Sequence, residues 1–132
     1  MENYIYSAKE LKTIASEAYR QIRVTTANSV FYSWGVSKIM YTMCNNLPAL
    51  ALRVNGRLLS GVVFVALNEG KDLYEVYTQE DGTNEPKLIA GDLYSDMVSD
   101  CIDKAIERGK DWNEYQKFLK LEREKVYRDI FG

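Results

Sequence analysis

Aromatic and basic side chains on predicted strands are the residues of this chain most able to support chemistry. The chain holds ten tyrosines and two tryptophans. Aromatic rings on a sheet, with cations beside them, can stack the bases of single-stranded nucleic acid. The candidate binding residues of this kind are Trp34, Tyr41, Arg53, Arg57, Tyr74 and Tyr77. Tyrosine also favours strands for packing alone, and no basic cluster accompanies the rings, so we favour a structural role for most of them.

Polar residues crowd two predicted strand ends, at residues 33–35 and 68–72. A cleft between these segments could hold a ligand, with Glu69 and Asp72 as its polar contacts. Turn geometry alone also explains asparagine, glycine and aspartate at such positions, because their backbones tolerate tight turns. We prefer the turn explanation and keep the cleft as an alternative.

Acidic residues recur along the predicted helix over residues 92–109. Asp96, Asp100 and Asp103 follow one another at spacings of four and three, and such a cluster could gather a hard cation. Acidic helix faces are far more often simply solvated. We therefore predict no metal site and no cofactor.

The chain contains no histidine. This excludes Ser-His-Asp triads, Cys-His pairs and zinc sites with histidine ligands. Cys44 and Cys101 lie in unrelated segments, and we expect both to be small buried apolar residues. No glycine-rich phosphate-binding motif is present. We therefore expect a protein that is not an enzyme.

Length and charge indicate one domain spanning residues 1–132, with a formal net charge of −2. No run approaches the roughly 20 apolar residues of a membrane span. The first residues lack the basic and apolar regions of a signal peptide, so we expect a cytoplasmic protein that does not enter a membrane. A weakly acidic chain also has little long-range attraction for nucleic acid.

Alternating apolar residues predict an α+β fold around an antiparallel meander of about four strands. Residues 49–54 alternate as a half-buried strand does, and Asn55-Gly56 then predicts a type I′ hairpin into residues 58–67. The other predicted strands cover residues 34–43 and 72–78, with a short edge strand at residues 87–90.

One N-terminal helix and two C-terminal helices complete the predicted fold. Ser7 and Glu10 form a capping box at the start of the first helix. We expect the second helix to begin at Asp92, to end at Gly109 and to turn its acids outward. The third should begin at Asp111 and pack its apolar side inward, through Tyr115, Phe118, Leu119, Val126 and Ile130.

The central strand, residues 58–67, is apolar on both faces. Such a strand needs cover on both sides, from helices on one and from a further helix or a second copy on the other. We therefore expect a non-enzymatic interaction protein that binds a protein partner or itself, as a symmetric dimer. A single-stranded nucleic-acid or nucleotide binder is the alternative.

Three segments together carry a resemblance. They are Ser33-Trp34-Gly35, residues 48–56 with Val54-Asn55-Gly56, and residues 67–74 with Asn68-Glu69-Gly70. They resemble small uncharacterised proteins of Bacteroides-type gut bacteria and of their phages and mobile elements. The resemblance implies an accessory factor of a phage or mobile element and carries no activity with it.

Overall fold

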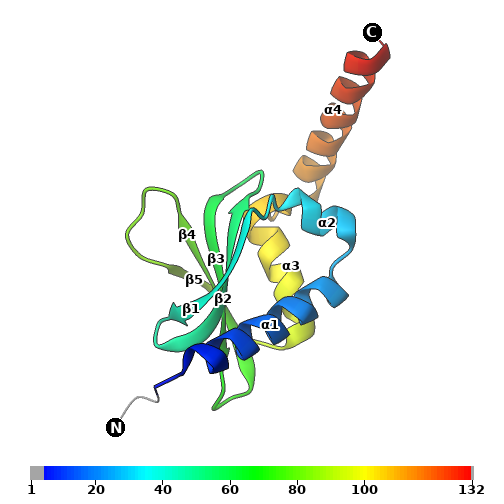
Figure 1. Cartoon of the computed structure of the whole chain (residues 1–132). Coiled ribbons are helices and arrows are strands. Elements are labelled where there is room, and N and C mark those ends of the chain that lie inside the picture. The colour runs from blue at the N-terminus through cyan, green and yellow to red at the C-terminus, as the bar shows by residue number, and fades with distance from the viewer. Residues whose placement is uncertain (1–4, 132) are drawn as a thin grey trace.

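The computed structural model describes residues 5–131 as a five-stranded antiparallel sheet with helices on one face (Figure 1). The strands follow one another in sequence order, as a meander. Their bounds are β1 Lys38–Cys44, β2 Leu47–Asn55, β3 Ser60–Asn68, β4 Leu73–Glu80 and β5 Lys87–Leu93. The helices are α1 Ala8–Thr25, α2 Asn28–Ser33, α3 Val98–Asp103 and α4 Trp112–Phe131; the 3-10 turn η1, Ser95–Met97, precedes α3, and the π-helical turn η2, Lys104–Arg108, follows it.

The predicted α+β meander is therefore confirmed, with β5 as its fifth strand. The type I′ turn lies elsewhere than predicted. Asn45 and Asn46 both have positive φ, 51° and 64°, and join β1 to β2 by two residues, with Cys44 paired to Leu47. Among residues 5–131 the glycines with positive φ do not include Gly56, and four residues separate β2 from β3.

Side chains of the central strands that point toward α1 and α3 form the main core. Leu50, Leu52, Val63, Val65 and Val76 are almost completely buried against the apolar side of α1. The helix supplies Ala15, Ala18 and Ile22 to this core, and α3 adds Val98 and Ile102. The capping box at Ser7 and Glu10 is present, since each backbone N–H is accepted by the other residue's side chain.

The opposite face of the sheet carries no helix among the described residues, yet its centre is buried. Ala49, Ala51 and Ala66 are at most 2% exposed, and Phe64 and Tyr77 lie beside two of these alanines. Because the central side chains are small, the neighbouring rings cover them. Of the two covers expected for this face, a further helix or a second copy of the chain, the further helix is absent from residues 5–131 (Figure 1).

The segment before β1 is helical rather than extended. Residues 34–43 were predicted as one strand, but Trp34 ends α2 and β1 begins only at Lys38. The Trp34 ring is fully buried, and its backbone oxygen accepts from the N–H of Asn55 at 2.9 Å. Phe31 of α2 packs against the Trp34 ring, with the centroids 5.5 Å apart.

The second predicted helix begins later than expected, because Asp92 lies in β5 with a φ of 54° and does not cap a helix. The expectation that all its acids face solvent is also wrong. Asp96 and Asp100 are exposed, whereas Asp103 and Glu107 are 8% and 6% exposed and face the protein interior.

The helix α4 departs most from expectation. It begins after Asp111 as predicted, since the carboxylate of Asp111 accepts from the N–H of Glu114 at 3.1 Å. It then projects away from the sheet and helices instead of folding over them (Figure 1). None of its described side chains is buried.

The core makes one sharp prediction about stability. Val63→Asp places a charge without a partner between the sheet and α1, and we expect a loss of more than about 4 kcal/mol in the free energy of unfolding. Val62→Asp is the matched control, because Val62 is only partly buried on the other face of the same strand. Urea denaturation of both variants checks this, and equal losses would contradict the assignment of the two faces.

Candidate interaction surfaces

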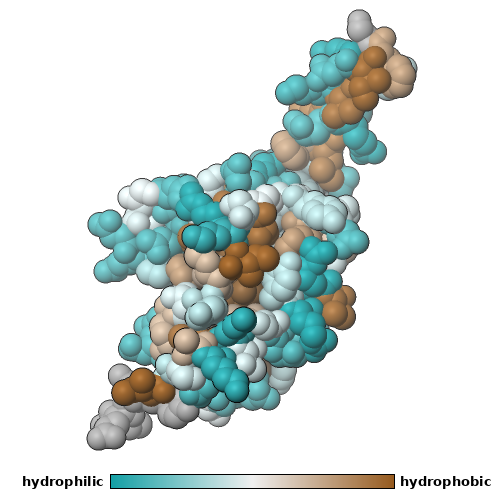
Figure 2. Space-filling model, in the orientation of Figure 1, coloured by the Kyte–Doolittle hydropathy of each residue, from teal (hydrophilic) through white to brown (hydrophobic). Residues whose placement is uncertain are grey.

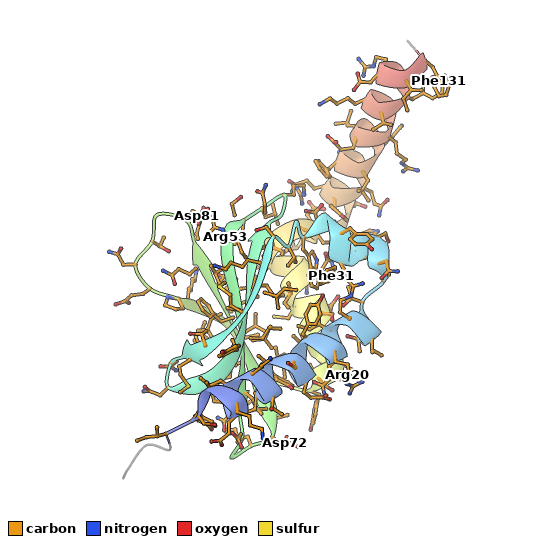
Figure 3. All side chains as sticks on the ribbon, viewed as in Figure 1. Arg20, Phe31, Arg53, Asp72, Asp81 and Phe131 are labelled. Carbon is orange, nitrogen blue, oxygen red and sulfur yellow. The ribbon has the colours of Figure 1, made fainter. Side chains whose placement is uncertain are left out.

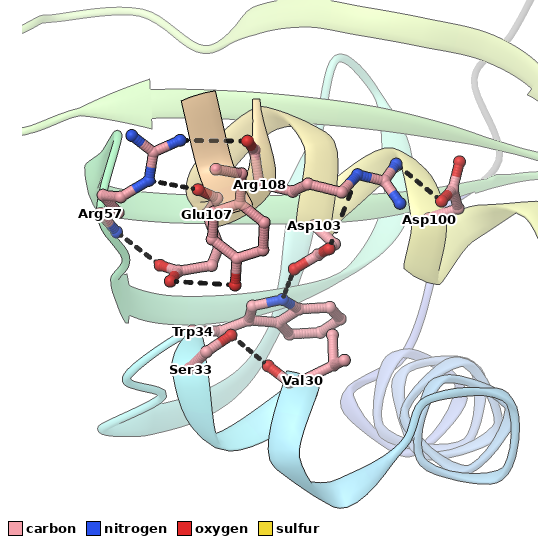
Figure 4. A network of polar contacts seen from close by, with 9 residues as sticks. Val30, Ser33, Trp34, Arg57, Asp100, Asp103, Glu107 and Arg108 are labelled. Carbon is pink, nitrogen blue, oxygen red and sulfur yellow. Dashed lines mark hydrogen bonds and ion pairs between the residues drawn. The ribbon is translucent and has the colours of Figure 1, made fainter. Parts of the chain in front are cut away.

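The loop between β2 and β3 holds the C-terminal end of the α3–η2 helix through Arg57 (Figure 4). The guanidinium donates to the carbonyl oxygens of Glu107 at 2.9 Å and of Arg108 at 3.0 Å. The carboxylate of Glu107 accepts in return from the backbone N–H of Arg57 at 2.7 Å. A cation at the C-terminus of a helix satisfies carbonyl groups that otherwise lack partners. We call these contacts the Arg57 clamp.

A second group of polar contacts fixes the other side of the same helix. The indole N–H of Trp34 donates to the Asp103 carboxylate at 2.9 Å (Figure 4). Arg108 lies 4.0 Å from the same carboxylate and 2.8 Å from that of Asp100. These contacts explain why acids occur at buried positions of the helix.

Arg57 also fixes the first turns of α4. The guanidinium carbon lies 5.4 Å from the ring centroid of Tyr115 and 5.1 Å from that of Phe118, within the range of a cation–π contact. The hydroxyl of Tyr115 is 3.5 Å from the carboxylate of Glu107. Burial, together with the nearby Glu107 carboxylate, raises the pKa of Tyr115. The base of α4 is thus attached to the body, whereas every described residue from Lys120 onward is exposed.

Apolar side chains of α4 lie along one side of the helix, interrupted by Glu122 and Arg123 at the turn between Leu119 and Val126. Their spacings of three, four, seven and four residues keep them on one side of a helix. The row consists of Trp112, Tyr115, Leu119, Val126 and Ile130, and we call it the α4 stripe. Trp112, Val126 and Ile130 are 57%, 54% and 66% exposed. Figure 2 shows apolar residues along the projecting helix.

An open groove of about 1020 Å³ lies between β5 and the α3–η2 helix. Its apolar part includes Leu58, Leu59, Ala90, Leu93, Cys101 and Ala105. Negatively charged acids and positively charged lysines both surround the groove. Gly109 and Lys110 close the end from which α4 leaves. Because both signs of charge line the groove, it favours neither an anionic nor a cationic ligand.

The predicted aromatic and basic residues do not share one face of the sheet. Tyr41 and Tyr74 pair with Leu50 and Leu67 in register, and the Tyr74 ring lies in the core beneath α1, its hydroxyl donating to Gln21 at 3.0 Å. Tyr41 lies on the α1 side as well, since directly paired residues share a face.

The remaining members of that set lie on the other face or inside the protein. Tyr77 accepts from the side-chain amide of Asn45 at 3.0 Å, and Arg53 pairs with Asp81 at 2.7 Å (Figure 3). Both belong to the face opposite the helices, while Trp34 is in the core and Arg57 forms the clamp. The structure therefore provides no continuous stacking platform among the described residues.

Glu69 and Asp72 are exposed residues of the turn between β3 and β4, where Asp72 has a φ of 56°. Trp34 lies at the other end of the sheet, where its backbone oxygen accepts from the N–H of Asn55. Asp72 accordingly lies far from Arg53 and Asp81 in Figure 3. The two polar segments are at opposite ends of β3 and do not line a common cleft.

Groups of three or more acidic or thiol side chains placed to hold a metal ion are not found in residues 5–131. Cys44 is buried, Cys101 is partly buried, and neither is in a disulfide. Burial, with a smaller contribution from Glu75, raises the pKa of the Cys44 thiol to about 11.

Comparison with known proteins gives no family. No family model matches the sequence, and no curated protein or solved structure matches it either. Over the described residues no helix has both the length and the apolar character needed to cross a membrane.

The Arg57 clamp predicts a stability effect at one side chain. Arg57→Met keeps the length of the side chain but removes two charged hydrogen bonds to carbonyl oxygens, so we expect a loss of about 2–3 kcal/mol. Hydrogen exchange should also accelerate in residues 104–118. Arg53→Met is the control, because its ion pair is exposed and worth less than about 1 kcal/mol. Similar losses in the two variants would rule out the clamp.

The Cys44 thiol predicts a pH dependence. Its pKa in the folded protein lies above the ordinary value of 9.0, so unfolding is favoured once the thiol can ionise in the unfolded chain. The stability that the folded chain gains by keeping this thiol protonated is complete below pH 9 and is lost as the pH rises toward 11. The free energy of unfolding should therefore fall less steeply in Cys44→Ala than in the unchanged chain. If the free energy of unfolding of the two proteins falls with the same slope between pH 8 and 11, this prediction is wrong.

Proposed function

We propose that this protein is a non-enzymatic protein-binding module that contacts its partner through the α4 stripe. The observation that carries the proposal is a 20-residue amphipathic helix whose described side chains are all at least partly exposed. Amphipathic helices of this kind bind by laying their apolar side into a groove of another protein. Trp112 and Tyr115 are of the residue types most often found as binding hot spots.

The energetics of α4 support this role. Isolated helices shorter than about 12–15 residues are marginal in water, and most helix stability in proteins comes from packing one face. Only the first turns of α4 are held by the body, through Arg57. Burial of Leu119, Val126 and Ile130 in a partner would contribute about 1.5–3 kcal/mol for each side chain that becomes fully buried.

Charge also favours a protein over a nucleic acid as the partner. The helix carries five cations and four acids, and Glu122 and Arg123 among them lie beside the stripe. They are Lys117, Lys120, Arg123, Lys125 and Arg128 against Glu114, Glu122, Glu124 and Asp129. Such a mixed surface does not provide the row of cations that a phosphate backbone requires. The resemblance to small phage and mobile-element proteins adds the expectation of an accessory factor.

The test uses a stripe variant and an off-stripe control on the same helix. We expect Leu119→Glu with Val126→Glu to abolish capture of the partner from a cell extract. Leu121→Glu should leave capture intact, because Leu121 is 63% exposed and lies on the opposite side of the helix. Cross-linking followed by mass spectrometry should place the captured protein against residues 112–130.

Denaturation curves control for folding, since residues that the body does not bury should change its stability by less than about 0.5 kcal/mol. Hydrogen exchange adds a second readout. Residues 120–131 should exchange rapidly in the free protein and become protected in the complex. Equal capture by the stripe variant and the control, with cross-links outside α4, would overturn the proposal.

A further inference from the structure

The two edges of the sheet differ in how well they are protected from pairing with another strand. At β5 the register shifts twice, Asp92 has a φ of 54°, and Lys87 and Asp92 are charged. Bulges and charges of this kind block the addition of a further strand. One edge of the sheet is therefore closed to another chain.

The strand β1 has neither a register shift nor a residue with positive φ, and its one charged residue is Lys38 at its first position. All seven of its residues pair with β2. One side of an edge strand presents backbone N–H and C=O groups that have no partner within the sheet. A long and regular edge of this kind, with a single charge at its end, is suited to pairing with a further strand.

Side chains on β1 add an apolar surface to this edge. Ile39, Tyr41 and Met43 pair with Leu52, Leu50 and Pro48, so they lie on the side of the sheet that carries α1. They are 49%, 46% and 40% exposed, because α1 covers β2 more fully than it covers β1. In Figure 2 an apolar area lies at the middle of the view, where β1 crosses the molecule in Figure 1.

We propose that β1 pairs antiparallel with β1 of a second copy of this chain, about a two-fold axis at Tyr41. Centring the axis there uses all seven residues of both strands. Ile39 then lies opposite Met43 of the other copy, and the two Tyr41 rings lie side by side. Lys38 lies opposite Cys44, so no like charges meet. The edge is thus complementary to itself.

The spacing of the layers fits the same arrangement. Neighbouring strands lie about 4.8 Å apart, so helices lying over β2 in the two copies would be about 14 Å apart across the junction. Packed helices are separated by about 8–10 Å, so the two α1 helices do not collide. The space between them is where Ile39, Tyr41 and Met43 of both copies lie. These six side chains would be covered when the two copies pair.

The dimer cannot add further copies, because the β1 and β5 edges of the sheet differ in how they are protected. Pairing of β1 with β1 uses the same surface in both copies and leaves only the protected β5 edges outside. The product is a closed dimer with one continuous sheet. It does not grow into a fibre.

Sedimentation equilibrium of the full chain between 5 and about 200 µM tests the proposal. We expect a dimer that persists at high salt, because the junction is apolar, and a monomer for Tyr41→Lys. Leu88→Lys on β5 is the matched control, since Leu88 is 51% exposed and the dimer should be retained. Circular dichroism verifies that both variants fold. A monomeric unchanged chain, or a Tyr41→Lys dimer as strong as the control, overturns the proposal.

A cysteine variant tests the register. In a background with Cys44→Ala and Cys101→Ala, Tyr41→Cys should form an intermolecular disulfide on mild oxidation, because directly opposite residues lie about 4.5–5.5 Å apart. Leu88→Cys should not. The Leu119→Glu, Val126→Glu variant separates this dimer from binding by α4: it should still dimerise. Loss of the dimer in that variant assigns association to α4 and overturns the β1 pairing.

Discussion

The packing of the β2–β3 loop against the end of the α3–η2 helix is the contact on which the rest of the structure depends. A Cβ atom on Gly56 would lie 2.3 Å from the carbonyl oxygen of Ile106, so only glycine permits this approach. The N–H of Leu58 donates to the same oxygen at 2.8 Å, and Arg57 takes the next two carbonyl groups. One four-residue loop thereby ends a helix, closes the core beside Ile106 and sets the direction in which α4 leaves.

Small side chains on the open face of the sheet explain why α4 is free to leave. A strand that is apolar on both faces normally requires a layer on each side. Here Ala49, Ala51 and Ala66 occupy the centre of the open face, and the rings of Phe64 and Tyr77 cover them from neighbouring positions. The sheet thus buries much of its second face without a second layer, and the third helix is not needed as a cover.

Local patterns in the sequence predicted the elements well and their long-range contacts poorly. The strand over residues 49–54 and the capping box at Ser7 depend on neighbours in the chain, and both are present, although the strand is buried on both faces rather than on one. The dipeptide Asn55-Gly56 predicts positive φ at both residues, and this fails because the close approach of Ile106, 50 residues away, is not visible in the sequence. The prediction that Asp103 and Glu107 face solvent is wrong for the same reason. Their partners, Trp34 and Arg57, lie in distant segments, and only the fold brings them together.

The positions of β1 and α4 decide how self-association and partner binding would combine. Lys38 pairs with Arg53 at the end of the sheet that carries the Arg57 clamp, so α4 leaves the body at the Lys38 end of β1. In an antiparallel β1 pair, the Lys38 ends of the two copies lie at opposite ends of the junction. The two α4 helices would then leave from opposite ends of one rigid sheet, with neither stripe covered by the dimer. Such a dimer is bivalent, and two sites on a rigid spacer raise the apparent affinity only for partners whose own sites match that separation. A single α4 lacks that geometric selection, so pairing through β1 would add specificity without adding a contact to the partner.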